Sequence, residues 1–432
     1  MNKKRYVQVG IGGRARFFYE SIASTYSETS EITAFCDINK KRMAYAQNLL
    51  TDKYGYPAVA LYGADEFEKM IAEQKPDYVI VSSIDRTHDR YIIRAMELGC
   101  DVISEKPMTT DEKKCKKIFD TIERTGKNLR VTFNYRYAPH SSKVRELIMA
   151  DTIGEVKAVH FDWFLNTSHG ADYFRRWHRD KRNSGGLLVH KSTHHFDLVN
   201  FWLGSRPETV FSMGDLMFYG RANAEERGET RFYSRVHGSE YAKDDPFALK
   251  MEGNDNLEKM YLNAESEDGY IRDQSVFGDG ISIEDTMGVM VRYESGAILT
   301  YSLVAYAPGE GFRAVVTGTK GRIEVNVGEK VYVNAASDKE DEGTVQNKSV
   351  VVHPMFGEPY NVELEEKSGG HGGGDPILLN DIFGTPESDP LGRAASHIDG
   401  ATSIMIGIAA NHSIASGLPV KIKDLIDIPI KA

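Results

Sequence analysis

Short apolar runs alternate with amphipathic stretches over the first 150 residues. Runs rich in valine, isoleucine and aromatic residues, each bounded by Gly, Asp or Pro, predict strands at 5–10, 31–37, 58–63, 77–83, 101–106 and 130–135. Between them, 89–98 and 111–126 each place apolar side chains along one helical face. Strands that alternate with helices predict right-handed crossovers and a parallel sheet, which is an α/β fold.

A different pattern begins near residue 150. Apolar and polar residues alternate, with Gly-containing turns between several runs, and predict strands at 154–165, 285–293, 296–306, 313–319, 321–327 and 330–335. One long helix, 186–204, interrupts this series, and helix-like segments follow at 376–384 and 393–417. The pattern predicts an antiparallel meander with one face free to pack on helices.

Two polar segments show no clean period. Residues 217–280 are polar, aromatic and dotted with glycine, and a stretch of that length within a compact domain is usually a functional insertion or mobile. It either covers the site or makes a subunit contact. Residues 336–349 are predicted to form an exposed turn.

Composition narrows the class of protein. The 432 residues carry 53 Lys+Arg against 63 Asp+Glu, a formal charge of −10, so the chain lacks the broad basic face that nucleic acid requires. No apolar run approaches the ~20 residues that cross a bilayer, and no signal-peptide run precedes the first glycines. Three scattered cysteines predict reduced thiols in a cytoplasmic protein.

A glycine turn follows the first predicted strand directly. Residues 10–15, GIGGRA, fit the pattern G-x-G-x-x-[GA] through Gly10, Gly12 and Ala15. Gly10 allows the tight turn, Gly12 lets the backbone approach a pyrophosphate, and Ala15 brings the next helix close to the sheet. The helix N-terminus then points amide N–H groups at the phosphates. The turn therefore predicts a dinucleotide site.

The second predicted strand ends at Asp37. A carboxylate there accepts hydrogen bonds from the adenosine ribose and repels the additional phosphate of NADP, which favours NAD. Alternatively, Asp37 simply starts a turn. Lys40, Lys41 and Arg42 follow closely and could accommodate a phosphate, so NADP stays the less favoured alternative.

The fifth predicted strand runs into Ser104-Glu105-Lys106-Pro107-Met108, and there the chain resembles a known family. It is similar to the glucose-fructose oxidoreductase / inositol dehydrogenase / rhizopine catabolism (Gfo/Idh/MocA) family of sugar and polyol dehydrogenases. The resemblance covers essentially the whole chain. Its pieces are the glycine turn, Asp37, His88, Glu105-Lys106-Pro107, FNYRYAP at 133–139 and GGLLVHKSTHHFD at 185–197.

The resemblance implies two domains. We expect a Rossmann domain with a doubly wound parallel sheet at 1–135, and an α+β domain with a large, mostly antiparallel open sheet at 136–432. The helix at about 393–416 is expected to pack back toward the Rossmann domain. The open sheet face implies a homo-oligomer, a dimer or tetramer.

The resemblance also implies roles for single residues. Lys106 matches the family lysine between the nicotinamide and the substrate hydroxyl, with Pro107 in an unusual peptide geometry after it. Glu105 matches the residue beside the cofactor, and His194 matches the proton acceptor. The chemistry of these residues agrees: a neutral histidine takes a proton near pH 7, and a lysine cation favours a developing alkoxide.

One position departs from the family, because many members carry Asp where this chain has His190. His190 and His194 are spaced i, i+4 and would share a helical face. Either His190 replaces the Asp as a substrate or relay group, or it packs on the core, or the two histidines bind a metal. A metal would need a third ligand such as Asp162, His169 or His371.

Two loops offer further contacts. The loop 172–186 carries Tyr173, Arg176, Trp177, His178 and Arg179, and an aromatic platform with guanidinium donors suits a sugar ring. It could also simply pack on the domain surface. The Gly-rich stretch 368–375 is either a flexible linker or brings His371 over the site.

Together these observations predict an NAD-dependent oxidoreductase that acts on a secondary hydroxyl of a sugar, polyol or glycoside. The alternatives are an NAD-dependent glycosidase with transient redox chemistry and a non-catalytic NAD-bound regulatory protein. The expected catalytic residues are Lys106, His194 and His190, and no metal is expected unless His190 and His194 bind one. Expected cofactor contacts are Gly10, Gly12, Gly13, Arg14, Asp37, Arg42, Ser82, Ser83, His88, Glu105, Lys106 and Asn134. Expected substrate contacts are Lys106, Tyr135, Arg136, Trp177, His178, His190, Lys191 and His194.

Overall fold

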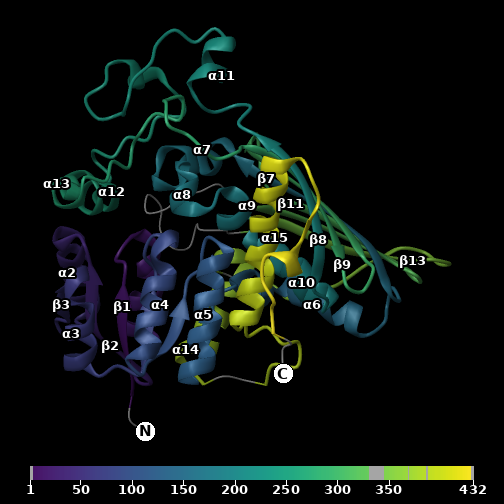
Figure 1. Cartoon of the computed structure of the whole chain (residues 1–432), viewed down its shortest axis with the longest axis horizontal. Helices are drawn as coiled ribbons and strands as arrows, with labels where there is room; N and C mark the ends of the chain where they lie inside the picture. The colour runs from purple at the N-terminus through teal and green to yellow at the C-terminus, as the bar shows by residue number, and fades with distance from the viewer. Residues whose placement is uncertain (1–2, 330–344, 368, 386–387, 430–432) are drawn as a thin grey trace.

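A computed structural model describes residues 3–329, 345–367, 369–385 and 388–429 of the chain. It contains two sheets, with the smaller one formed by the N-terminal third of the sequence (Figure 1). The predicted strand at 330–335 and most of the predicted turn at 336–349 lie outside the described residues.

The first sheet is parallel, in the order β3-β2-β1-β4-β5-β6, which confirms the doubly wound Rossmann fold. Its strands are β1 (Lys4–Val9), β2 (Ser30–Asp37), β3 (Ala60–Gly63), β4 (Tyr78–Val81), β5 (Asp101–Ser104) and β6 (Leu129–Val131). Its crossover helices are α1 (Arg16–Ala23), α2 (Lys40–Tyr54), α3 (Phe67–Gln74), α4 (His88–Glu97) and α5 (Glu112–Thr125). The strand order reverses between β1 and β4, and ligands bind at such a switch point.

The second sheet is larger and mixed, in the order β14-β13-β12-β11-β7-β10-β9-β8-β15. Its strands are β7 (Val156–Asn166), β8 (Pro207–Asp215), β9 (Thr286–Tyr293), β10 (Ile298–Ala307), β11 (Glu310–Gly318), β12 (Gly321–Glu329), β13 (Val345–Pro354), β14 (Tyr360–Asn361) and β15 (Val420–Lys421). Only β7 and β10 pair in parallel among these described strands, so the mostly antiparallel sheet is confirmed.

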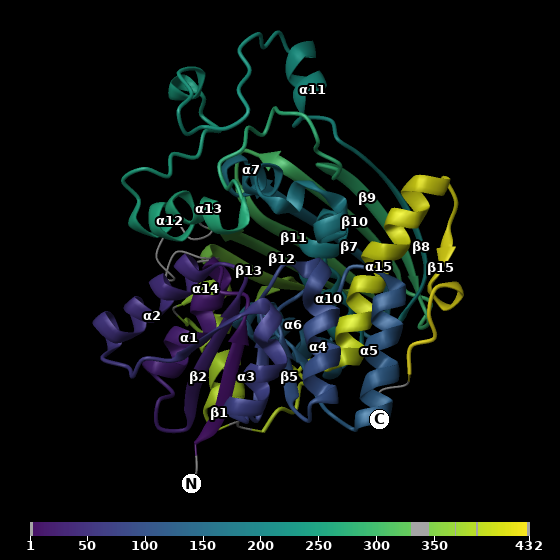
Figure 2. The ribbon, with the colours of Figure 1, turned by 60° about the vertical axis from the view of Figure 1, so that its left-hand side comes forward.

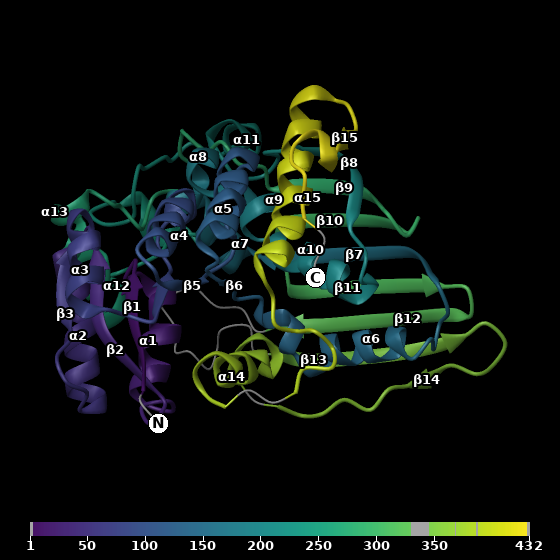
Figure 3. The same cartoon turned by 60° about the horizontal axis from the view of Figure 1, so that its bottom comes forward.

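Helices cover one face of this sheet and leave the other open (Figure 3). The helices of this half of the chain include α6 (Pro139–Met149), α7 (Thr167–Arg175), α8 (Lys181–Ser184), α9 (Leu187–His190), α10 (Thr193–Leu203) and α15 (His397–Ser416). Along β9 and β10, buried residues alternate with exposed or half-buried ones, as expected for a sheet with one covered face.

The end of the chain returns to the Rossmann fold. Helix α14 (Gly370–Phe383) packs on its sheet, where the Phe383 ring contacts Tyr6 edge-on at 5.1 Å between centroids. Helix α15 reaches the other side, where Gly400 lies against Val131 and Met108 (Figure 2). Both halves of the chain therefore share one packed core, as the expected return of the last helix requires.

The long polar segment is an ordered insertion with α11 (Arg221–Glu226), α12 (Asp255–Met260) and α13 (Glu265–Asp268). Figure 1 shows it arching from the large sheet to the top of the Rossmann fold, with α12 and α13 above α2. No helix among the described residues is both long and apolar enough to span a bilayer.

Candidate active site

The glycine turn lies at the switch point of the Rossmann sheet. Gly10 has φ +82°, and a Cβ there would meet the Ser83 Cα at 2.4 Å, so only glycine fits. A Cβ at Gly12 would instead meet no atom within 4 Å. The backbone at Gly12 is thus open to an approaching ligand, which is the cradle a dinucleotide pyrophosphate requires.

Asp37 faces this turn from the end of β2. Its Oδ2 accepts a hydrogen bond from the Ile11 N–H at 2.6 Å, and its Oδ1 accepts one from Asn39 N–H at 2.8 Å. Burial raises the pKa of Asp37, while Arg42 and the two N–H groups favour the charged carboxylate. The Arg42 guanidinium lies 3.6 Å from Asp37 and 3.1 Å from Asp268 of the insertion.

The loop after β4 forms hydrogen bonds both with the glycine turn and with the loop that follows β5 and carries Lys106, here called the lysine loop. The Ser82 hydroxyl donates to the Gly10 carbonyl at 2.8 Å, and Ser83 Oγ lies 2.8 Å from Thr87 Oγ1. The two ring nitrogens of His88 contact the Pro107 carbonyl at 2.8 Å and the Ser83 carbonyl at 3.0 Å. Ser82, Ser83 and His88 therefore fix the backbone at the edge where the cofactor is expected.

The lysine loop follows β5 at the same edge. Glu105 accepts hydrogen bonds from Arg14 Nε at 2.7 Å and from the Lys106 N–H at 3.1 Å, and the Lys106–Pro107 peptide is cis. The Lys106 Nζ donates to the His190 carbonyl at 3.0 Å, so the two halves of the chain meet here. Burial, followed by the nearby Lys191 cation, lowers the pKa of Lys106 to about 8.

The predicted single helix at 186–204 is wrong. It is divided into α9 and α10, because Ser192 N–H bonds to the Leu187 carbonyl at 2.8 Å and the Ser192 hydroxyl lies 2.8 Å from the Tyr301 hydroxyl. His190 ends the first helix, while His194 lies in the first turn of the second. The two histidines therefore do not share one regular helical face.

His190 contacts a carboxylate from the Rossmann fold. Its Nδ1 lies 2.5 Å from Asp85 Oδ2, and its ring packs against those of His178 at 4.2 Å and Tyr173 at 5.5 Å between centroids. Burial raises the pKa of Asp85, and burial with the Lys106 cation lowers that of His190. Among the described residues no group of three potential ligands could hold a metal ion.

His194 lies beside Tyr135 and His371, with ring centroids at 5.0 Å and 6.1 Å. Its Nδ1 has no hydrogen-bond partner among the described residues. Burial lowers its pKa well below the usual value, and Lys106 and Lys191 add to the effect. His194 is therefore a neutral imidazole at pH 7, able to accept a proton.

The Gly-rich stretch 369–375 brings His371 to this group. His371 Nδ1 lies 3.0 Å from Asp375 Oδ2, and Asp375 Oδ1 accepts a hydrogen bond from Asn134 at 2.7 Å. A Cβ at Gly374 would lie 2.5 Å from the Asn134 carbonyl, which is why glycine is needed at this close approach. Of the two interpretations of the stretch, the structure favours the one in which His371 joins the site.

Three carboxylates at the site were not found by sequence reasoning as site residues: Asp85, Glu329 and Asp375. Glu329 ends β12 and accepts a hydrogen bond from the Tyr135 hydroxyl at 2.9 Å, and burial raises its pKa to about 7. Nothing in the local sequence marks Glu329 and Asp375, because the tertiary fold alone brings them to the site. For Asp85 the signal was its place after a predicted parallel strand, since such loops meet at one sheet edge.

Of the other predicted substrate contacts, Trp177, His178 and Lys191 lie near His190 or in the aromatic group beside it, whereas Arg136 lies elsewhere. Trp177 stacks on His178 at 3.6 Å and meets His190 edge-on at 5.9 Å, and the Lys191 Nζ lies 4.6 Å from the Trp163 ring. Arg136 does not join them. It is buried and pairs with Asp197 at 2.6 Å and Asp399 at 3.1 Å, so it anchors helices rather than facing a substrate.

Asp162 and His169, two of the residues predicted as possible third metal ligands, form hydrogen bonds with other residues. Asp162 accepts from the Ser302 hydroxyl at 2.5 Å on the open sheet face, and His169 contacts Glu310 at 2.6 Å.

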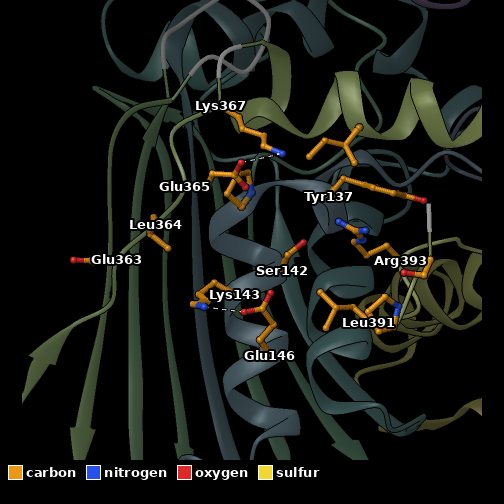
Figure 4. A pocket seen from close by; sticks show the side chains of 14 residues that line it. Tyr137, Ser142, Lys143, Glu146, Glu363, Leu364, Glu365, Lys367, Leu391 and Arg393 are labelled. Carbon is orange, nitrogen blue, oxygen red and sulfur yellow. Dashed lines mark hydrogen bonds and ion pairs between the residues drawn. The ribbon is translucent and has the colours of Figure 1, made fainter. Parts of the chain in front are cut away.

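A separate pocket of about 460 Å³ lies between α6 and residues 363–367 (Figure 4). None of the predicted catalytic or cofactor residues line it. Four of its charged side chains form two ion pairs, Lys143 with Glu146 at 2.8 Å and Lys367 with Glu365 at 3.2 Å. It is therefore not a candidate for the chemistry at Lys106.

The fold and the glycine turn define a class, the proteins with a dinucleotide-binding Rossmann fold. Comparison with known proteins narrows this class. The model of the Gfo/Idh/MocA oxidoreductase family, NAD-binding Rossmann fold, matches residues 4–133, and that of its C-terminal alpha/beta domain matches residues 145–422. The chain belongs to this family, as its motifs predicted. The predicted boundary at residues 135 and 136 stays a prediction.

Relatives agree with this assignment. A Bacillus subtilis protein named as an oxidoreductase, YteT, is 36% identical over 98% of both chains. The Escherichia coli D-glucoside 3-dehydrogenase is 28% identical over 46% of this chain and 54% of its own length. The crystal structure of aldose-aldose oxidoreductase from Caulobacter crescentus shares the fold at 16% identity, with a TM-score of 0.63 over 97% of this chain and 100% of that one.

Proposed function

We propose that this chain is an NAD-dependent dehydrogenase that oxidises or forms a secondary hydroxyl of a sugar, polyol or glycoside. One observation carries the proposal. The Lys106 Nζ from the Rossmann fold donates to the His190 carbonyl at 3.0 Å, and His194 follows four residues later at the start of α10, so the lysine and the histidine helix meet at one site. Alcohol oxidation needs a group that accepts the hydroxyl proton and a group that stabilises negative charge on the oxygen. A neutral imidazole and a cation at one reacting oxygen supply these two groups.

The residues present fit a nicotinamide dinucleotide. Gly10, Gly12 and Arg14 would hold the pyrophosphate, Asp37 the adenosine ribose, and Glu105 with Lys106 would lie at the nicotinamide end. The Gly13 N–H already donates to the Tyr261 hydroxyl. The bound cofactor supplies the acceptor or donor of hydride. Family membership and the sugar dehydrogenase among the relatives support this class of reaction.

NAD is favoured over NADP by the neighbours of Arg42. That guanidinium already contacts Asp37 at 3.6 Å, Asp268 at 3.1 Å and the Met260 carbonyl at 3.2 Å. A 2′-phosphate would have to displace these contacts and approach two carboxylates. Arg42, which could otherwise bind the 2′-phosphate of NADP, is therefore already held by other contacts.

The protein's own residues manage the proton. Lys106, held by the His190 carbonyl, would orient the substrate oxygen and stabilise negative charge on it. His194 would take the hydroxyl proton through its imidazole. His190 is proposed to replace the family Asp as a relay group, because Asp85 supplies the carboxylate that the substitution removed.

We also propose that the open sheet face forms a homo-oligomer. Met213 and Met290 lie on adjacent strands of that face and are 69% and 52% exposed. Exposed apolar side chains on one face are typical of an interface. Light scattering of the purified protein, with Met290→Glu as the disrupting variant, tests this proposal.

A substrate panel tests the reaction. Purified protein is incubated with NAD or NADP and a series of sugars, polyols and glycosides, and both NADH absorbance and released sugar are measured. The proposal expects NADH with a ketone product and no released sugar. Released sugar without net NADH would favour the glycosidase, and cofactor binding without any turnover would favour the regulatory protein.

A further inference from the structure

The insertion 217–280 reaches across to the Rossmann fold at its adenosine end. Its small apolar cluster, Leu249, Met251, Leu257, Met260 and Tyr261, packs against Tyr45 of α2. The Tyr45 hydroxyl donates to Asn256 Oδ1 at 2.5 Å, and Asn39 Nδ2 donates to the Ala264 carbonyl at 3.0 Å. Lys41 Nζ donates to the Asn263 carbonyl at 2.9 Å. The insertion is therefore bound to α2 along its first turns (Figure 2).

Tyr261 touches the glycine turn itself. Its hydroxyl accepts a hydrogen bond from the Gly13 N–H at 3.0 Å, and its ring lies between the guanidinium groups of Arg42 at 5.5 Å and Arg272 at 5.3 Å. A hydroxyl that accepts one hydrogen bond keeps its own proton for donation. That proton lies beside the turn at which a pyrophosphate would bind.

Asp268 approaches from the same insertion. Its carboxylate is nearly buried and pairs with Arg42, the residue that also pairs with Asp37. One guanidinium thus lies between two carboxylates, one from each half of the chain. A ribose with free hydroxyls suits this arrangement, whereas an added phosphate would meet two negative charges.

We propose that the insertion supplies the outer wall of the dinucleotide site, with Tyr261 donating to the pyrophosphate and Asp268 rejecting a 2′-phosphate on the ribose. This proposal rests on the proposed function. Because the insertion is bound to α2, its contacts with the dinucleotide would slow release of the cofactor. The ligand class is a dinucleotide with an unphosphorylated adenosine ribose, held with slow exchange.

The wall continues toward the reacting end. Arg272 forms a bidentate pair with Asp172 at 2.9 Å and 3.1 Å, and Asp172 also pairs with Arg176 at 3.2 Å. The Arg176 cation favours the charged carboxylate of Asp85 and the neutral form of His190, because it lowers the pKa of both groups. A series of buried charged side chains therefore extends from the adenosine wall toward the site at Lys106.

Binding measurements on the full chain test this inference. Calorimetry with NAD and NADP gives dissociation constants, and stopped-flow displacement of NADH gives its release rate. Tyr261→Phe should weaken NAD binding about tenfold and speed NADH release, because one charge-assisted hydrogen bond is lost. Asp268→Asn should improve NADP binding relative to NAD by about tenfold.

Matched controls lie in the same insertion. Tyr241→Phe and Asp255→Asn change exposed residues of the same types and should leave both constants unchanged. If the wild-type protein binds NAD and neither Tyr261→Phe nor Asp268→Asn changes the binding constants, the proposed role of the insertion is wrong and the proposed function stands. A wild-type protein that binds neither dinucleotide would instead overturn the proposed function. Both variants are isosteric or remove one atom, and circular dichroism verifies that they fold.

Discussion

The two ends of the dinucleotide site are built in different ways. At the adenosine end, the first contacts come from the first βαβ unit, where Gly10 and Gly12 lie in the turn after β1 and Asp37 ends β2. At the reacting end, Lys106 comes from a loop, His194 from helix α10 and Glu329 from the end of β12, and these elements lie far apart in the chain. The first end depends on local backbone geometry, whereas the second depends on how the two halves of the chain pack.

The same difference appears in the charges. Asp37 accepts hydrogen bonds from two backbone N–H groups, Ile11 of the glycine turn and Asn39, and lies beside the Arg42 guanidinium. Around Lys106, burial and several ionisable neighbours shift the pKa values of Lys106, His190 and His194 downward. Groups with shifted pKa values cluster where proton transfer occurs, so the reacting end has the character of an active site.

The largest effect is expected at His194. His194→Gln should lower kcat by about 10²–10⁴-fold, because the proton acceptor is lost, while NAD affinity stays within a few-fold. Steady-state kinetics and calorimetry measure the two quantities. His412→Gln, which changes a histidine with a side chain 49% exposed, is the control. A His194→Gln enzyme with wild-type kcat would remove the role assigned to His194.

Arg136 separates anchoring from catalysis. Arg136→Leu leaves Asp197 buried without its partner, and breaking such a pair costs about 3–5 kcal/mol in the free energy of unfolding. Urea denaturation should show this loss, while kcat/KM per folded molecule stays close to wild type. A normal stability with a raised KM would return Arg136 to the substrate contacts.

The smallest effect is a shift in pH dependence. A lysine is charged below its pKa, so kcat/KM should fall as pH rises through about 8, where Lys106 loses its proton. Lys191→Met removes a neighbouring cation and should raise the Lys106 pKa, moving this alkaline limb upward by up to about one unit. A limb that stays in place or moves downward would contradict the coupling between the two lysines.

The sequence predicted the parallel sheet, the glycine turn and Lys106 because each depends on local pattern and motif. It did not predict the break between His190 and His194, since the Ser192 contacts to Leu187 and Tyr301 come from the folded structure. The sequence could not show that Arg136, predicted as a substrate contact, is held in buried ion pairs, because its partners Asp197 and Asp399 lie far along the chain. The insertion 217–280 has no regular hydrophobic period from which its structure could be predicted, because contacts with α2 hold it in place.

The central claim is that Lys106 and His194 act on one reacting oxygen, and a double-mutant cycle tests it most directly. Turnover is measured for Lys106→Ala, His194→Gln and the double variant, with NAD binding verified for each. Residues that act as a unit give strongly non-additive losses, so the double variant should be little slower than the slower single variant. Losses that simply multiply, or a Lys106→Ala enzyme with normal turnover, would contradict the shared site.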